Sequence, residues 1–314
     1  MKLGAFIIPT GIGASIGGFA GDASKWARKI AKKTKLIVNP NVVNAACFSG
    51  ISDNMLYVEG YTLDEFFKGN ANLQEAFNNK IGVVFDKAIP TDILNIHINT
   101  INAVKTVYDI DILDYEITED EVGVNFYIDN SGISTGNIKN LETLKNTAQK
   151  LINKGCNAIA IVCHFHEEQG DEYSNGVGVD PVGGVEAIIS HYISKEFKIP
   201  CAHAPAFSNV EISTKLVDSR CSAEYITPTY LPCILLGLNN APQISNTKGY
   251  SVEDIDFVIV PYNALGGIPV LEAARRNKRI FAIAENHTVL NVTSKKLGIK
   301  CDIIKTYEDL LEHI

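Results

Sequence analysis

The two ends of this 314-residue chain repeat one sequence plan. Each copy begins with a short apolar run that ends at a proline, Pro9 in the first copy and Pro261 in the second. A Gly-Gly pair, a helical stretch with basic residues at its end, a second apolar run and an Asn-containing segment follow in the same order. Two related units that face each other would form one cleft from two sets of loops. The repeat therefore predicts a small-molecule site between pseudo-symmetric halves. At one constant offset the copies match Ala27, Asn39 and Asn44 with Ala274, Asn286 and Asn291.

The composition is that of a globular protein and argues against two classes of partner. Hydrophobic residues make up 46% of the chain and charged residues 20%. A net charge of −8 and scattered basic residues argue against nucleic acid. The longest apolar runs are strand-sized, far below the roughly 20 residues that a membrane span needs. We therefore expect neither nucleic acid nor a membrane as partner.

The cysteines indicate the cellular compartment. There are seven of them, an odd number without paired spacing, which favours free thiols in a reducing environment. We expect a cytoplasmic protein. The sequence leaves the oligomeric state open, a homo-oligomer included.

Short apolar runs alternate with helix-like stretches, which is typical of an α/β fold with a largely parallel sheet. Residues 111–128 differ, because apolar and polar residues alternate there and predict antiparallel strands with one solvated face. Residues 211–227 are predicted to be helical. No linker separates domains, so we expect one compact unit of residues 1–314. Its alternative is a pair of interleaved lobes, approximately residues 1–110 plus 250–314 and residues 111–249.

A Gly-rich segment, residues 10–22, follows the first strand. Glycine allows positive φ angles and a close approach of backbone N–H groups to a ligand. A helix that starts near Asp22 would direct its positive dipole end at an anion. The pattern matches neither the dinucleotide fingerprint nor the P-loop. It predicts a carboxylate or phosphate site, and a packing loop with Asp22 as a helix cap is the alternative. The glycines predicted to contact the anion are Gly11, Gly13, Gly17 and Gly18, joined by Gly266 and Gly267 of the second copy.

Polar side chains follow the second strand of each copy, where open parallel sheets place their ligands. Asn39 and Asn44 lie there in the first copy, and Glu285 and Asn286 in the second. Amide groups both donate and accept hydrogen bonds, so these residues are predicted to bind the ligand. Turn formation by the asparagines is the alternative.

A segment with two histidines and several acidic residues follows the strand predicted at residues 158–163. His164, His166 and Glu167 are residue types that bind Zn²⁺ or another divalent metal. No defined metal motif is met, and an acidic loop is also a common solvated surface. We predict no cofactor and keep a divalent metal at these residues as an alternative.

Residues 154–164 resemble the strand and Gly-Cys-Thr-His region of aspartate/glutamate racemases. Those enzymes are pseudo-symmetric α/β proteins with two thiols on opposite sides of a cleft. The resemblance implies that Cys163 and Cys47 form such a pair, one thiolate taking a proton and the other thiol delivering one. This chain lacks the threonine after Cys163, and a small buried strand residue is the alternative.

A second chemically dense segment lies at residues 199–205. Cys201 and His203 are two positions apart, so their side chains point the same way in an extended segment. A thiol activated by an imidazole is a nucleophile or a proton shuttle. Glu59 lies between two aromatic residues, a setting that can raise the pKa of its carboxyl group for acid–base work. Core packing of Cys201 and His203 and a surface position for Glu59 are the alternatives.

Long motifs spread over nearly the whole chain resemble an uncharacterised family known as domain of unknown function 3326. The resemblance implies no activity. It directs attention to Glu59, Cys201, His203 and the Gly-rich segment, and away from the Cys47/Cys163 pair. The segments that carry it are residues 8–23, 39–44, 54–61, 185–191, 199–205 and 231–233.

The leading functional hypothesis is an enzyme that acts on a small carboxylate- or phosphate-bearing metabolite. Its most concrete form is a cofactor-independent isomerase or racemase that uses cysteine and histidine acid–base chemistry. One alternative is a non-catalytic metabolite-binding or sensor protein. Another is a metal-dependent hydrolase or lyase.

Overall fold

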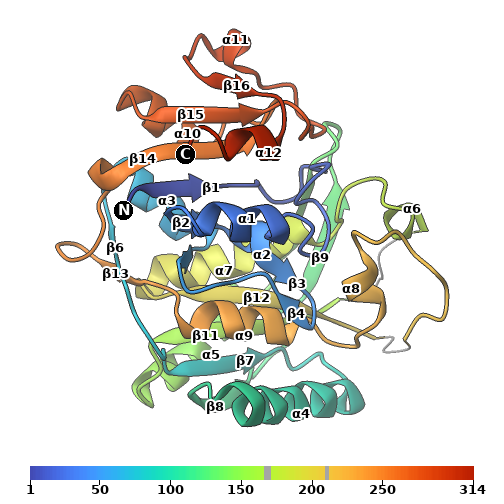
Figure 1. The fold of residues 1–314 in the computed structure, drawn as a ribbon. Coiled ribbons are helices and arrows are strands. Elements are labelled where there is room, and N and C mark those ends of the chain that lie inside the picture. Colours follow the sequence, from blue (N-terminus) through green and yellow to red (C-terminus); the bar gives the residue numbers. More distant parts are fainter. Residues whose placement is uncertain (166–170, 209–211) are drawn as a thin grey trace.

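Two parallel β-sheets form the framework of this computed structural model, which describes residues 1–165, 171–208 and 212–314. The two sheets lie one above the other in Figure 1, and the arrows of β1 and β7 point the same way. The α/β fold with largely parallel strands and a few antiparallel pairs, predicted from the sequence, is confirmed. The six-stranded sheet has the order β16 (Asp302–Ile304), β15 (Arg279–Ile283), β14 (Ile255–Pro261), β1 (Leu3–Phe6), β2 (Lys35–Val38) and β5 (Met55–Tyr57).

The two ends of the chain meet in the centre of the six-stranded sheet. β1 pairs with β14, and the two repeated units extend outward from this pair in opposite directions. Since a parallel crossover is right-handed, opposite directions place the two crossover helices on opposite faces of the sheet. α1 (Ser24–Ala31) accordingly packs on one face with Phe6, and α10 (Ile268–Arg275) packs on the other with Val258. α3 (Gly60–Lys68) shares the face of α10, and α12 (Tyr307–Leu310) shares the face of α1.

The middle of the chain builds a four-stranded parallel sheet, which lies below the first in Figure 1. Its central strands β7 and β11 are apolar and buried on both sides, as expected for parallel strands covered by helices, whereas the edge strand β8 alternates buried or half-buried with exposed residues. α4 (Thr91–Tyr108) and α9 (Leu231–Asn239) cover one face, and α5 (Leu141–Asn153) and α7 (Gly183–Phe197) cover the other. The strand order is β12 (Cys201–Phe207), β11 (Ala158–Phe165), β7 (Ile81–Phe85) and β8 (Ile112–Ile117).

Three short antiparallel pairs complete the fold. β9 (Val124–Ile128) and β10 (Ser134–Ile138) form the antiparallel portion expected in the middle of the chain, whereas β8 joins the parallel sheet. The chain crosses between the two sheets along the pair β6 and β13, which runs vertically in Figure 1. β7 is a strand of the four-stranded sheet, and α4 packs against that sheet. The other pairs are β6 (Asn72–Gln74) with β13 (Gln243–Ser245), and β3 (Asn44–Ala45) with β4 (Phe48–Ser49).

The prediction of a helix at residues 211–227 is largely wrong. Of residues 211–227, only α8 (Ser222–Tyr225) is helical within the part that the structure describes. Short polar side chains bind nearby backbone there instead: Ser213 accepts from the N–H of Lys215, and Asp218 from that of Arg220. Such bonds compete with a helix. The remaining short helices are α2 (Pro40–Val43), α6 (Asp171–Ser174), the 3₁₀ turn η1 (Val252–Asp254) and α11 (Ser294–Leu297).

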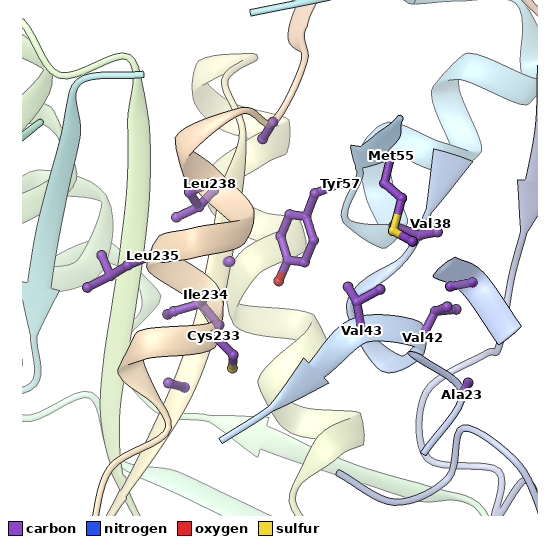
Figure 2. Close-up of a cluster of buried hydrophobic side chains, with 14 of the residues drawn as sticks. Ala23, Val38, Val42, Val43, Met55, Tyr57, Cys233, Ile234, Leu235 and Leu238 are labelled. Atoms are coloured by element: carbon purple, nitrogen blue, oxygen red, sulfur yellow. The ribbon is translucent and has the colours of Figure 1, made fainter. Parts of the chain in front are cut away.

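One hydrophobic core joins the two sheets. The ring of Tyr57 lies between α9 and the segment that carries Val42 and Val43 (Figure 2), and its hydroxyl group donates to Asn44 Oδ1 at 3.1 Å. Gly237 of α9 leaves room for this ring, because a Cβ atom there would lie 2.8 Å from it. The two sheets are therefore held together by apolar packing next to the loops at their strand ends.

Candidate functional site

Two adjoining cavities lie between the sheets, at the carboxyl ends of their strands. Open α/β sheets bind ligands at such ends, where neighbouring loops diverge. The first, here called the Gly-loop cavity, has a volume of about 100 Å³ and is walled by the Gly-rich segment. The second, the Glu59 cavity, has a volume of about 330 Å³ and lies next to Glu59 and the start of α10. Thr10, Pro40 and His203 line both cavities, so the two adjoin, and together they are here called the cleft.

The Gly-rich segment forms one wall of the Gly-loop cavity. Gly11, Gly13, Gly17 and Gly18 all line it, and the first three have positive φ angles of 71°, 55° and 88°. At Gly18 a Cβ atom would lie 2.1 Å from the carbonyl oxygen of Ala14, so no side chain fits. Asp22 does not cap α1 but accepts the N–H of Gly17 at 2.7 Å. Burial raises the pKa of Asp22 to about 6.

The matched asparagines of the two repeats hold this segment in place. Asn39 accepts the N–H of Ile8 at 2.9 Å and donates to its carbonyl oxygen at 2.7 Å. Asn286 bonds Ile16 in the same two-way manner, at 3.1 and 2.8 Å. Each amide thus pairs with both backbone groups of one residue. Asn39 fixes the chain just before the Gly-rich segment, and Asn286 fixes a point within it.

The other predicted ligand contacts divide between cleft and scaffold. Asn39 and Gly267 line the Glu59 cavity, and Asn44 lines the Gly-loop cavity. Gly266, Glu285 and Asn286 line neither of the two. Glu285 accepts the backbone N–H of Tyr307 at 2.7 Å, next to the Asn286 amide that bonds the Tyr307 hydroxyl group.

Acid–base residues gather on one wall of the Glu59 cavity. His203 Nδ1 lies 2.8 Å from Ser190 Oγ, and Glu59 Oε2 lies 3.8 Å from His191 Nε2. All four residues line the cavity. Glu59 also caps α3, because its carboxylate accepts the N–H groups of Tyr61 and Thr62 at 2.7 and 2.6 Å.

Desolvation sets the protonation of these groups. It raises the pKa of Glu59 to about 7 and lowers that of His203 to about 3, while the nearby His191 lowers the pKa of His203 further. Desolvation also lowers the pKa of His191. At neutral pH both imidazoles are therefore uncharged, whereas the pKa of Glu59 lies close to neutral pH.

The pKa of Glu59 predicts how stability depends on pH. The folded protein keeps a proton on Glu59 at pH values where the unfolded chain has released it, so this contribution is present at low pH and is lost as pH rises through about 7. The free energy of unfolding should therefore fall between about pH 5 and about pH 8, and in Glu59→Gln this fall should be smaller by on the order of 3 kcal/mol. Urea unfolding of both proteins across that range measures the difference, and parallel pH profiles would contradict the expectation.

Three helices begin at the Glu59 cavity. α3, α7 and α10 start at glycines or next to them, and Gly60, Gly184 and Gly267 line the cavity. At Gly184 a Cβ atom would lie 1.9 Å from the carbonyl oxygen of Ser134, which explains the glycine at this close approach. Helix N-termini carry partial positive charge, so they favour a negatively polarised group.

Three carboxyl groups that were not among the predicted site residues line the Gly-loop cavity. They are Asp180, Glu186 and Glu224, with the rings of Tyr173 and Tyr230 beside them. Neither lysine nor arginine appears among the described residues that line the two cavities. Glu186 could have been predicted from the sequence as a site residue. It is a charged residue at a buried position of α7, between the apolar residues Val182 and Ile189.

The structure does not bring the predicted thiols into the cleft. Cys201 and Cys163 are buried under α5 and α7, and neither lines the two cavities of the cleft. Burial raises the pKa of both thiols well above the usual value. Cys47 belongs to the turn between β3 and β4, which packs on α9 at the opposite face of the four-stranded sheet. This sheet separates Cys47 from Cys163, and all seven cysteines are free.

The histidines considered for metal binding are only partly described. His164 Nε2 lies 2.9 Å from Ser208 Oγ, and its backbone N–H donates to Asp86. His166 and Glu167 lie outside the described residues. Among the residues that are described, no three His, Cys, Asp or Glu side chains are grouped as metal ligands.

Comparison with known proteins identifies the family. The profile of the family described as "Protein of unknown function (DUF3326)" matches residues 4–313. The chain belongs to this family. A relative in a Synechococcus strain, described as an uncharacterized lipoprotein, is 37% identical over 311 residues, which cover 96% of this chain and 86% of that protein. No solved structure matches the chain.

The family assignment confirms the resemblance predicted from the sequence, whereas the racemase likeness is not supported by any match. Among the described residues, no helix is both long and apolar enough to cross a membrane. The cytoplasmic location expected from the cysteines stays a prediction.

Proposed function

We propose that this DUF3326 protein is a cofactor-independent enzyme that moves a proton on a small polar metabolite bound in the cleft. The observation that carries the proposal is the convergence of two pairs, Glu59 with His191 and Ser190 with His203, on one cavity of about 330 Å³. An acid–base group beside an oriented imidazole in a pocket of ligand size is typical of such a site.

Glu59 is the proposed proton carrier. A general acid or base works best when its pKa lies near the working pH, and burial brings the pKa of Glu59 to about 7. Its carboxylate would take a proton from a carbon next to a carbonyl group, and the resulting neutral acid would return it to a neighbouring atom. This cycle consumes no oxidant and is an isomerisation.

His203 is proposed to donate a hydrogen bond to the carbonyl oxygen of the substrate. Its lowered pKa keeps the ring neutral, and the contact with Ser190 fixes the ring through Nδ1. When Ser190 donates to Nδ1, the other ring nitrogen carries hydrogen and can polarise a substrate oxygen. The N-termini of α3, α7 and α10 favour the same developing negative charge.

Hydrogen exchange with solvent tests the proposal and does not require that the substrate be identified first. The protein is incubated in D₂O with a metabolite extract, and mass spectrometry records which compounds gain deuterium at carbon. We expect at least one such compound, with the rate reduced 100-fold or more in Glu59→Gln and in His203→Ala. Cys156→Ala, which changes a buried thiol that lines neither cavity of the cleft, serves as the control and should retain the rate. Absence of protein-dependent exchange, or equal rates in all variants, would overturn the proposal.

A non-catalytic metabolite-binding protein is the second candidate, favoured by one observation. Both carboxylate oxygens of Glu59 already accept backbone N–H groups of α3, as a purely structural cap would. A compound that binds in the cleft and protects the protein from thermal unfolding, without any deuterium exchange, would support this second candidate instead.

A further inference from the structure

We propose that the Gly-loop cavity binds the positively charged amine of the ligand, with Glu186 as its principal contact. This inference rests on the proposed function for the same cleft and adds the chemical class of the ligand. It is carried by one buried carboxyl oxygen that has no hydrogen-bond partner among the described residues, and by the surroundings of that oxygen.

Within the described part of the chain, no hydrogen bond to Glu186 Oε1 explains the burial of this side chain. It lies on α7 with 6% of its surface exposed, and it lines the Gly-loop cavity. Its Oε1 atom is fully buried and has no hydrogen-bond partner among the described residues. Leaving a buried carboxyl oxygen without a hydrogen bond costs free energy. We therefore expect a bound ligand to supply the missing hydrogen-bond donor.

The rest of the cavity wall suits a cation. Asp180 and Glu224 add two further carboxyl groups, and the rings of Tyr173 and Tyr230 add aromatic surface, which attracts ammonium groups. Arg220 is nearby but stacks on Phe19 at 4.6 Å and pairs with Asp218 at 3.0 Å, and it does not line the cavity. An anion here would face several carboxyl groups without a compensating basic side chain.

An organic amine fits better than a metal ion. The carboxyl groups line the wall of the cavity but, within the described part of the chain, form no group of three that could hold a metal. An ammonium group offers three hydrogen-bond donors, which can reach separate acceptors around a cavity of about 100 Å³.

The position of the cavity connects the amine to the proposed chemistry. His203 lines both cavities, so a ligand with its amine at Glu186 extends past His203 into the Glu59 cavity. The ligand class is therefore a small primary amine whose carbonyl-bearing part lies beside Glu59.

Matched pairs of small probes test the inference. Binding of methylammonium, ethanolamine and alaninamide is compared by NMR titration with that of their neutral analogues methanol, ethylene glycol and lactamide. We expect the cations to bind at least ten-fold more tightly than the neutral compounds. Glu186→Gln should remove this preference, whereas Glu196→Gln, a substitution of the same type near the other end of α7, should retain it. Should Glu186→Gln not fold, Glu186→Asp is expected to weaken the preference by withdrawing the carboxylate.

Three outcomes would overturn the inference: no preference for the cations in the wild-type protein, an unchanged preference in the Glu186 variants, or displacement of the amines by Mg²⁺ at micromolar concentration. The readout is independent of turnover. Amine binding that needs Glu186 therefore stands even if no deuterium exchange occurs, and exchange on compounds without an amine would support the proposed function while removing this inference.

Discussion

Replacing Tyr57 with alanine is expected to lower the free energy of unfolding by about 3–5 kcal/mol, the usual range for loss of a large buried aromatic side chain. Tyr57 is almost fully buried, and its ring packs between α9 of one sheet layer and α2 with β5 of the other (Figure 2). Its removal leaves a cavity at the contact that joins the two layers. Urea unfolding followed by circular dichroism measures the change.

Tyr57→Phe separates packing from hydrogen bonding. It keeps the ring and loses only the bond from the hydroxyl group to Asn44, so it should cost about 1 kcal/mol. If the alanine variant were no less stable than the phenylalanine variant, the ring would not join the layers and the shared core would be disproved.

Asn286→Ala is expected to cost about 3 kcal/mol, since it leaves several buried polar groups without partners. The Asn286 side chain is fully buried, accepts the N–H of Ile16, and donates to the Ile16 carbonyl oxygen and to the Tyr307 hydroxyl group. The Gly-rich segment should loosen at the same time, which faster amide hydrogen exchange at residues 11–18 would report.

Asn291→Ala is the matched control, since Asn291 belongs to the same repeat but is exposed. Its effect should stay within about 0.5 kcal/mol. Equal stability losses for the two variants, or unchanged exchange in the Gly-rich segment of Asn286→Ala, would contradict the role given to Asn286.

The repeat in the sequence predicted much of the architecture. Its constant offset indicated two related units, and these units pair through β1 and β14 at the centre of one sheet. The Gly-rich segment was predictable as a cleft wall, because a strand, a Gly-rich loop and a helix in that order place the loop at the carboxyl edge of a parallel sheet. Gly11, Gly13, Gly17 and Gly18 line the cleft for that reason.

The roles of individual residues were less predictable. Asn39 and Asn286 recur in both copies, which favoured ligand binding, yet each is engaged by the backbone of a residue far away in the chain, Ile8 and Ile16. Such pairing depends on tertiary contacts that local spacing does not reveal.

The opposite wall of the cleft could not be predicted for a related reason. Asp180, Glu186 and Glu224 lie outside both repeats and come together only when α7 and α8 fold over the Gly-rich segment. The alternation of Cys201 and His203 predicted a pair, and both side chains do face α7. Only His203 reaches the cleft, because Cys201 lies deeper along the strand, near its buried start.

A crystal structure of the protein after incubation with a metabolite extract tests the central claim most directly. The account predicts one bound compound that passes His203, with its amine within hydrogen-bond distance of Glu186 and a carbon next to a carbonyl group beside Glu59. A compound bound away from the cleft, or one that presents an anionic group to Glu186, would contradict it.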